Sequence, residues 1–329
     1  MVSESKTAIV LVNTGSPSAP TPEAVRTYLK RFLSDPRIAP KTPVWPFILN
    51  FCILPKRSKA SAQRYQSVWM PDGSPLTVYQ TSLADKLQKC FNETADQIIV
   101  RSAYSYSSPD VLEVCSDLQA TDITNLIVLP LFPQTAYSQA SGTVVDAVTS
   151  ALAQLSWDIQ PQIILGYADN QRYIEALAAN ITNAGFNPAS DDRLFISYHS
   201  IPLADIEAGD TYPEEVSLTN ALLAEKLKLK ADQWCTGFQS RFDKERSWLS
   251  PFTTDVMKEF SEQGSGTLYF ICPNFAIDCL ETLYDIPAEL QPAWEAVSTS
   301  RFVYVPCLND TDTHVDVLYD VITSKTNLS

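Results

Sequence analysis

Short apolar runs alternate with longer helix-like stretches along the whole chain. The runs are roughly four to eight residues long and continuously apolar, a pattern typical of buried parallel strands joined by helical crossovers. The predicted strands are Ala8–Val12, Ile98–Ala103, Leu126–Leu131, Ile163–Gly166, Leu194–Tyr198, Gln233–Phe238, Leu268–Cys272 and Phe302–Val305. The hydrophobic pattern therefore predicts an α/β fold.

Four predicted strands precede about Gly166 and four follow it. We expect two Rossmann-like halves, residues 1–166 and 167–329, each a four-stranded parallel sheet flanked by helices. The last helix is a candidate to pack back on the first half. Neither a Gly-x-Gly-x-x-Gly after a strand nor a Walker-type loop occurs, so this layout is predicted without dinucleotide chemistry.

Caps and periodicity predict three of the connecting helices. Thr21 is a predicted N-cap with Pro22 in the first turn. The apolar face of this helix consists of Val25, Tyr28, Leu29, Phe32 and Leu33. A second helix is predicted from about residue 175 to 183, stopping at Gly185, and a third from 251 to about 264.

The composition bounds the class of protein and its partners. With 329 residues, 45% hydrophobic and 19% charged, the chain is globular and can bury a large core. A net charge of −14 argues against a nucleic-acid partner, because phosphate backbones need a basic face. The charge is compatible with a cationic substrate, although a solvated acidic surface is the commoner explanation.

The cysteines and the N-terminus bear on the compartment. The seven cysteines are odd in number and form no Cys-x-x-Cys pair, which favours reduced thiols over a disulfide framework, a zinc site or an iron–sulfur cluster. Residues 1–7 are short and polar, and no apolar run approaches the ~20 residues of a membrane span. We expect a cytoplasmic protein.

Only two histidines occur in the chain, and one of them, His199, closes a predicted strand. The stretch from Leu194 reads Leu-Phe-Ile-Ser-Tyr-His-Ser-Ile-Pro, so the imidazole is expected at the carboxyl end of a sheet strand. Open α/β sheets bind ligands at that edge. Taken alone, the local pattern slightly favours the alternative of a strand-end histidine satisfied by a backbone carbonyl.

A second group of polar residues follows the predicted strand that ends at Cys272. We expect a helix here, on which Asp278, Glu281 and Asp285 share one face. If this strand neighbours that of His199, an imidazole and a carboxylate would face each other. Metal handling and proton transfer both fit such a pair, while an exposed acidic face is the ordinary alternative.

One segment breaks the alternation of strands and helices. Residues 39–54 are the most apolar part of the chain outside the strands, with Trp45 as an aromatic anchor, and a basic stretch follows at 56–59. Such a segment can lie in a membrane interface or form an apolar lip over a ligand. A buried helix that covers one sheet is an equal alternative.

A series of motifs in one order now identifies a family that the chain resembles. The series consists of Leu11–Pro17 with Ala19–Val25, Phe32–Arg37, Gly73–Leu76, Leu129–Gln134, Ser197–Pro202, Gly209-Asp210-x-Tyr212-Pro213, Phe238–Phe242, Trp248-Leu249-x-Pro251 and Asp278–Leu283. In this order they resemble ferrochelatase, the enzyme that inserts Fe²⁺ into a porphyrin in the last steps of haem synthesis. The likeness covers nearly the whole chain.

The resemblance implies a porphyrin cleft between two Rossmann-like halves and assigns roles to particular residues. It implies His199 and Glu281 as catalytic residues and His199, Glu281 and Asp285 as metal contacts. It implies that the porphyrin is bound by Thr14, Phe132, Ser138 and Trp248. Glu289 would continue an acidic row along a helix with π-type turns, but Pro287 is expected to disturb that helix.

The resemblance also implies the substrates and partners. They are protoporphyrin IX and ferrous iron, with no redox cofactor required and with peripheral membrane contact through an apolar lip at about residues 39–59. A coproporphyrin III ferrochelatase, whose members tend to lack the lip, and a non-catalytic porphyrin-binding relative are the alternatives. Departures from the family pattern occur at Thr14, at Ser105 and in the loop 135–142, which is one residue longer than usual.

Overall fold

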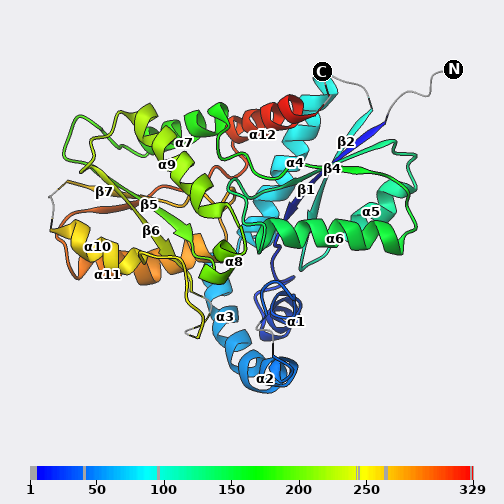
Figure 1. Cartoon of the computed structure of the whole chain (residues 1–329), viewed down its shortest axis with the longest axis horizontal. Coiled ribbons are helices and arrows are strands. Elements are labelled where there is room, and N and C mark those ends of the chain that lie inside the picture. Colours follow the sequence, from blue (N-terminus) through cyan, green and yellow to red (C-terminus); the bar gives the residue numbers. More distant parts are fainter. Residues whose placement is uncertain are drawn as a thin grey trace. The chain divides into compact units, whose positions relative to one another are not determined.

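The chain folds as two compact units (Figure 1). The computed structural model describes residues 6–39, 42–94, 97–241, 243, 245–262, 266–326 and 328. Unit 1 comprises Met1–Leu131, Tyr137–Leu165 and Leu318–Ser329. Unit 2 comprises Phe132–Ala136 and Gly166–Val317.

Unit 1 contains a four-stranded parallel sheet in the order β2-β1-β3-β4. Its strands are β1 (Thr7–Asn13), β2 (Ile98–Tyr104), β3 (Asn125–Pro130) and β4 (Pro161–Ile163). Its helices are α1 (Pro22–Phe32), α2 (Trp45–Ile48), the π-helix η1 (Leu49–Ile53), α3 (Leu54–Val68), α4 (Pro75–Thr94), α5 (Val111–Gln119), α6 (Ala140–Gln154) and the greater part of α12 (Asp312–Lys325).

Unit 2 repeats this arrangement with a parallel sheet in the order β6-β5-β7-β8. Its strands are β5 (Arg193–His199), β6 (Trp234–Gln239), β7 (Leu268–Ile271) and β8 (Phe302–Tyr304). Its helices are α7 (Gln171–Asn183), α8 (Leu203–Glu207), α9 (Tyr212–Leu227), α10 (Thr253–Ser261), the π-helix η2 (Glu281–Leu290) and α11 (Gln291–Glu295).

Each sheet has a topological switch point beside its first strand. In unit 2, β6 lies on one side of β5 and β7 on the other, so successive connections run over opposite faces of the sheet. Figure 1 shows α7 and α9 on one face of this sheet and α10 and α11 on the other. Ligands of open α/β sheets bind beyond the carboxyl ends of the strands that flank a switch point, here β5 and β7.

Aromatic packing fixes β5 against the α10 and α11 face. The ring of Phe195 on β5 stacks on Phe270 of β7, with centroids 5.2 Å apart. Both side chains are fully buried in a cluster that also contains Trp294 of α11 and Ile286 of η2. Each such side chain contributes about 1.5–3 kcal/mol by burial, so the strand that ends in His199 is held rigidly.

The structure confirms the predicted α/β fold class and the existence of every predicted strand. The fourth prediction overlaps β4 only at Ile163, because the chain leaves the sheet there and turns at Gly166, whose φ is +67°. Thr21 caps α1 by accepting a hydrogen bond from the amide of Ala24.

The other two helix predictions are right in place and inexact in their ends. The helix predicted from about residue 175 begins earlier, as α7, because Asn170 caps it by accepting from the amide of Tyr173. The helix predicted over 251–264 is α10, which begins at Thr253 and ends at Ser261. Gly264, its predicted end, lies outside the described residues.

Candidate functional site

His199 is the last residue of β5, and one of its ring nitrogens keeps a lone pair that can accept a proton or bind a metal ion. Its Nδ1 lies 2.7 Å from the carbonyl oxygen of Ser200. A carbonyl oxygen can only accept, so in the neutral ring Nδ1 carries the hydrogen and Nε2 keeps a lone pair. The side chain is half-buried. Because the carbonyl occupies only one nitrogen, the structural and the chemical interpretations of His199 are compatible.

The surroundings of His199 keep the imidazole neutral near pH 7. Burial lowers the pKa of His199 below its ordinary value of 6.5. The hydrogen bond to Ser200 and the negative charge of Glu281 oppose this shift, but burial is the largest cause. A neutral imidazole with a free lone pair can accept a proton or bind a metal ion.

Glu281 opens η2 and is half-buried. The connection that leads to it leaves β7, which lies beside β5 in the sheet, so His199 and Glu281 flank the switch point of unit 2. The influence of the Glu281 carboxylate on the pKa of His199 reflects this proximity. The strand that ends near Cys272 is thus the neighbour of the strand of His199, as the predicted pairing of an imidazole with a carboxylate requires.

Asp278 does not lie on a helical acidic face, contrary to the prediction from its spacing. The helix expected after Cys272 does not form there, because residues 272–279 are turns and irregular chain. The Asp278 side chain is buried and accepts hydrogen bonds from Thr282 Oγ1, Tyr304 Oη, Cys307 N and Asn309 Nδ2, at 2.7, 2.6, 3.2 and 2.7 Å. It anchors the start of η2 and does not share an acidic face with Glu281.

Pro287 does not end the helix that carries Glu281. Residues Glu281–Leu290 adopt a π-helix, which includes Pro287. Proline clashes with the carbonyl of residue i−4 in an α-helix, and the wider π turn relieves that clash. Asp285 is half-buried and Glu289 is exposed, so the row of carboxylates runs from the switch point toward solvent.

Trp248 lies close to His199 along the backbone pairing. Trp248 forms an antiparallel bridge with Pro202, and the amide of Leu249 donates to the carbonyl of Ile201 at 2.9 Å. The indole is buried, with the guanidinium of Arg246 over its ring at 4.8 Å. Trp248 is thereby held beside Pro202, which follows His199 by three residues in the sequence.

Phe132, the other predicted porphyrin contact in unit 2, is half-buried in the segment Phe132–Ala136. The segment is tied to α9, because the amide of Thr135 donates to Glu215 Oε2 at 2.7 Å. Burial raises the pKa of Glu215, although the bond from Thr135 opposes the shift.

Thr14 and Ser138, the remaining predicted porphyrin contacts, belong to unit 1 and are half-buried. Thr14 follows β1, and its amide donates to Asn13 Oδ1 at 2.8 Å. The turn before α6, which contains Ser138, is held by Arg37. That guanidinium donates to both carboxylate oxygens of Asp146, at 2.5 and 3.0 Å, and to the carbonyl of Tyr137 at 2.9 Å.

The apolar segment of unit 1 buries Leu49 and Leu54 but exposes other large apolar side chains, so the alternative of a buried helix is wrong. Phe47 is 63% and Phe51 69% exposed, and their ring centroids lie 4.8 Å apart. Trp45 is anchored instead, since its indole donates to the carbonyl of Leu33 at 2.7 Å. Across the described ranges, no helix is both long and apolar enough to cross a bilayer. Residues 40–41 of the predicted lip lie outside the described residues.

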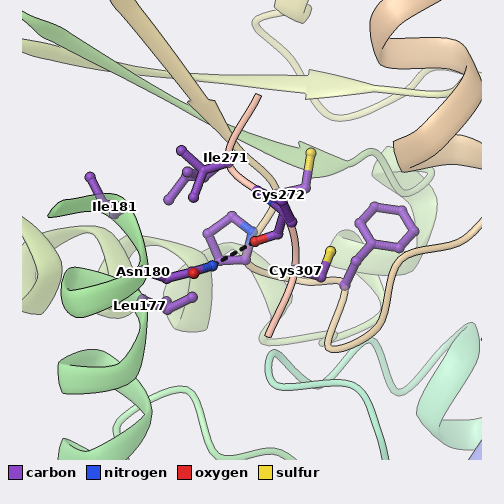
Figure 2. Close-up of a pocket in the computed structure, with 10 residues that line it drawn as sticks. Leu177, Asn180, Ile181, Ile271, Cys272 and Cys307 are labelled. Carbon is purple, nitrogen blue, oxygen red and sulfur yellow. Dashed lines mark hydrogen bonds between the residues drawn. The ribbon is translucent and has the colours of Figure 1, made fainter. Parts of the chain in front are cut away.

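Thiols near η2 remain protonated. Burial raises the pKa of Cys272, Cys279 and Cys307, so none offers a thiolate near neutral pH. Cys272 and Cys307 line a cavity of about 10 Å³, which is large enough only for a water molecule. Figure 2 shows both side chains. A hydrogen bond from Asn180 to the carbonyl of Pro306 closes one side of the cavity. A porphyrin cannot enter this cavity.

The described side chains of His, Cys, Asp and Glu do not gather into any group of three that could hold a metal ion. His199, Glu281 and Asp285 are therefore not assembled as a three-ligand centre in this structure.

Sequence reasoning missed the residues that hold His199 in place. The hydroxyl of Tyr212 donates to the carbonyl of His199 at 2.9 Å, and Ser200 is bonded through both its amide and its hydroxyl. The signal present in the sequence is the Gly-Asp-x-Tyr-Pro motif at 209–213, whose spacing alone predicts no role for Tyr212.

Comparisons with known proteins agree with this arrangement. The family model described as Ferrochelatase matches residues 6–326. A ferrochelatase of Dechloromonas aromatica (strain RCB) is 39% identical over 96% of this chain and 86% of its own length. A ferrochelatase of Sodalis glossinidius (strain morsitans) is 40% identical over 98% of this chain and 95% of its own length.

A solved structure of SirB from Bacillus subtilis with Fe³⁺ shares the fold. Its TM-score is 0.60 at 12% identity, covering 97% of this chain and 95% of that one. The order of motifs, the paired parallel sheets and the relatives all lead to one conclusion: the chain belongs to the ferrochelatase family.

Proposed function

We propose that this protein inserts Fe²⁺ into protoporphyrin IX to form protohaem, with His199 and Glu281 as the catalytic residues. The observation that carries the proposal is the pair itself. An imidazole with a free Nε2 lone pair and a carboxylate flank one switch point, where open α/β sheets bind their ligands. Membership of the ferrochelatase family supports a porphyrin as the substrate.

The reaction exchanges two protons for one metal ion. A free-base porphyrin carries two inner N–H groups, and both hydrogens leave as protons when Fe²⁺ binds the four nitrogens. His199 Nε2 accepts one pyrrole proton, and the Glu281 carboxylate stabilises the imidazolium that results. Solvent water accepts the other proton. The oxidation state of iron does not change, so the reaction requires no redox cofactor and no iron–sulfur cluster.

The row of carboxylates on η2 suits delivery of the cation. Asp285 and Glu281 are both carboxylates of η2, and hard oxygen and imidazole ligands both bind Fe²⁺. A loose set of ligands releases the ion to the porphyrin more readily than a closed site would. In this proposal Fe²⁺ is a substrate, and His199, Glu281 and Asp285 contact it in passing.

We assign porphyrin binding to Thr14, Phe132, Ser138 and Trp248. Phe132 and Trp248 offer aromatic surface to a flat macrocycle. The exposed apolar segment around Phe47 and Phe51 is the proposed lip, which covers the porphyrin and contacts the membrane surface. Its apolar character favours protoporphyrin, which has two carboxylates, over coproporphyrin, which has four.

The test is anaerobic Fe²⁺ insertion, followed by absorbance, with protoporphyrin IX and coproporphyrin III as separate substrates. We expect insertion into protoporphyrin and a loss of about 10²–10⁴ in kcat for His199→Ala. His314→Gln is the matched control, because His314 is the other histidine of the chain and is buried elsewhere in unit 2.

Other outcomes separate the alternatives. Faster insertion into coproporphyrin contradicts the argument from the lip but keeps the chemistry. Binding of porphyrin, measured by fluorescence quenching, without insertion of any metal identifies a non-catalytic porphyrin-binding protein and overturns the proposal.

A further inference from the structure

The Gly-Asp-x-Tyr-Pro motif spans the end of the loop between α8 and α9 and the first two residues of α9. Gly209 has φ +102°, a conformation that side chains disfavour. The buried carboxylate of Asp210 accepts a hydrogen bond from the amide of Tyr212 at 3.0 Å. Tyr212 is the first residue of α9 and is itself buried. Each of these features sets the direction of the Tyr212 side chain.

The hydroxyl of Tyr212 reaches the end of β5. It donates to the carbonyl oxygen of His199 at 2.9 Å. The pairing of β5 with β7 stops at Ile196, whereas the pairing with β6 continues to His199. The last residues of β5 therefore lack support from β7, and Tyr212 supplies a hydrogen bond from the helix layer.

The peptide unit between His199 and Ser200 is bonded at both ends. The carbonyl of His199 and the amide of Ser200 belong to one rigid plane. Tyr212 holds the carbonyl, and the carbonyl of Gln239 accepts from the Ser200 amide at 2.8 Å. This plane cannot rotate without the loss of a buried hydrogen bond, which is unfavourable.

The next carbonyl along the chain, that of Ser200, accepts from Nδ1 of His199. Ser200 is also held through its hydroxyl, which donates to the carbonyl of Leu249 at 2.8 Å. The direction of the imidazole therefore depends on a short, fully bonded piece of backbone. Among the described residues, Tyr212 is the one residue of α9 that donates a hydrogen bond to this piece of backbone.

We propose that Tyr212 is a positioning residue, which fixes the peptide after His199 and thereby the tautomer and direction of the catalytic imidazole. The catalytic part of this inference rests on the proposed function. Gly209 and Asp210 of the Gly-Asp-x-Tyr-Pro motif then shape the turn that directs the Tyr212 side chain.

The first experiment compares Tyr212→Phe with Tyr198→Phe in steady-state Fe²⁺ insertion. Both residues are buried, and each variant loses one hydroxyl. The hydroxyl of Tyr198 donates to Asn220 Oδ1 at 2.8 Å and not to the peptide after His199. We expect Tyr212→Phe to lower kcat about 10- to 100-fold with KM unchanged within about threefold. We expect Tyr198→Phe to lower kcat less than about threefold.

The second experiment reads His199 without any reaction. The chain has two histidines, so the side-chain ¹⁵N signals of the full-length protein can be assigned with His199→Ala. In the wild type we expect a protonated Nδ1 and a bare Nε2 for His199. Tyr212→Phe should move or broaden these signals and leave those of His314 in place. Gly209→Ala, a milder variant that strains only the backbone, should act in the same direction.

The outcomes distinguish the two proposals. If the wild type metallates no porphyrin, the proposed function fails. The role of Tyr212 is then tested by the ¹⁵N signals of His199 alone. Unmoved His199 signals in Tyr212→Phe overturn the positioning role. An equal fall in kcat for Tyr198→Phe, or an unchanged kcat for Tyr212→Phe in an active enzyme, overturns it as well.

Discussion

The two sheets share one topology but end their first strands differently. β1 ends at Asn13 and β5 ends at His199, at equivalent positions of the orders β2-β1-β3-β4 and β6-β5-β7-β8. The side-chain oxygen of Asn13 accepts from the amide of Thr14, so it is used in the local turn. His199 also bonds to its neighbour, but an imidazole has a second nitrogen on the far side of the ring. One residue type can thus close a strand and still act as a base.

The helices after the third strands differ as well. In unit 1 that helix is α6, a regular α-helix, and in unit 2 it is the π-helix η2. Residues four apart drift by about 40° around an α-helix. The wider π turn reduces this drift, so Glu281, Asp285 and Glu289 stay closer to one line. At the same place in the fold, unit 1 therefore has the regular α-helix α6, and unit 2 has η2 with its row of carboxylates.

The largest expected effect separates the two ends of that row. Glu281→Gln should lower kcat by about 10²–10³, which corresponds to about 3–4 kcal/mol, because it removes the charge beside His199. Asp285→Asn, one turn farther along, should cost about tenfold or less. Steady-state insertion kinetics measure both. A larger loss for Asp285→Asn would reverse the roles assigned along η2.

A second prediction concerns the anchor of η2. Asp278→Asn replaces an acceptor of four hydrogen bonds by an amide that clashes with at least one donor. We expect a loss of about 2–3 kcal/mol in the free energy of unfolding. Denaturant unfolding measures it, with Asp158→Asn on the surface of unit 1 as the control, at less than about 0.5 kcal/mol. Equal values for the two variants would show that the network does not hold the unit.

A third prediction concerns acid, because both histidines of the chain lie in unit 2. Burial lowers the pKa of His314 from 6.5 to about 4. A base whose pKa falls on folding stabilises the fold above its unfolded pKa. That contribution is lost as the pH falls from about 6.5 toward 4. Between pH 7 and 4.5 the loss from His314 is about 2–3 kcal/mol.

Denaturant unfolding at both pH values measures this loss. His314→Gln should unfold with a pH dependence that is weaker by that amount, whatever its stability at pH 7. An unchanged pH dependence would mean that His314 is not the titrating group. His199 should act in the same direction, since burial lowers its pKa too.

The smallest expected effect lies in unit 1. Replacing Phe47 and Phe51 together by Ser should change the free energy of unfolding by less than about 0.5 kcal/mol, because both side chains are exposed. Binding to anionic vesicles, measured by co-sedimentation, should weaken about tenfold. The matched control is Leu54→Ser, a buried change in the following helix, which should destabilise the fold instead. Vesicle binding that does not change in the double variant would remove the membrane role of the lip.

The sequence by itself determined the positions of the strands and the place of His199 at the end of one of them. Continuous apolar runs located the strands, because a strand buried on both faces must be apolar throughout. The same pattern placed His199 at a strand end, since Ile201 and Pro202 stop the strand just beyond it. Thr21 predicted the start of α1, because a capping side chain bonds to an amide only three residues away.

Only the tertiary structure decided the role of each polar residue near His199. Asp278 matched a helical acidic face by spacing, but Tyr304 and Asn309, 26 and 31 residues away, bring it into the interior. Tyr212 supports His199 from α9, and Pro287 is tolerated by a π turn that spacing alone does not predict. Local pattern fixes which residues can be buried. The donors and acceptors that meet a buried polar group come from distant segments, and because an unpaired buried group is costly, those partners decide its role.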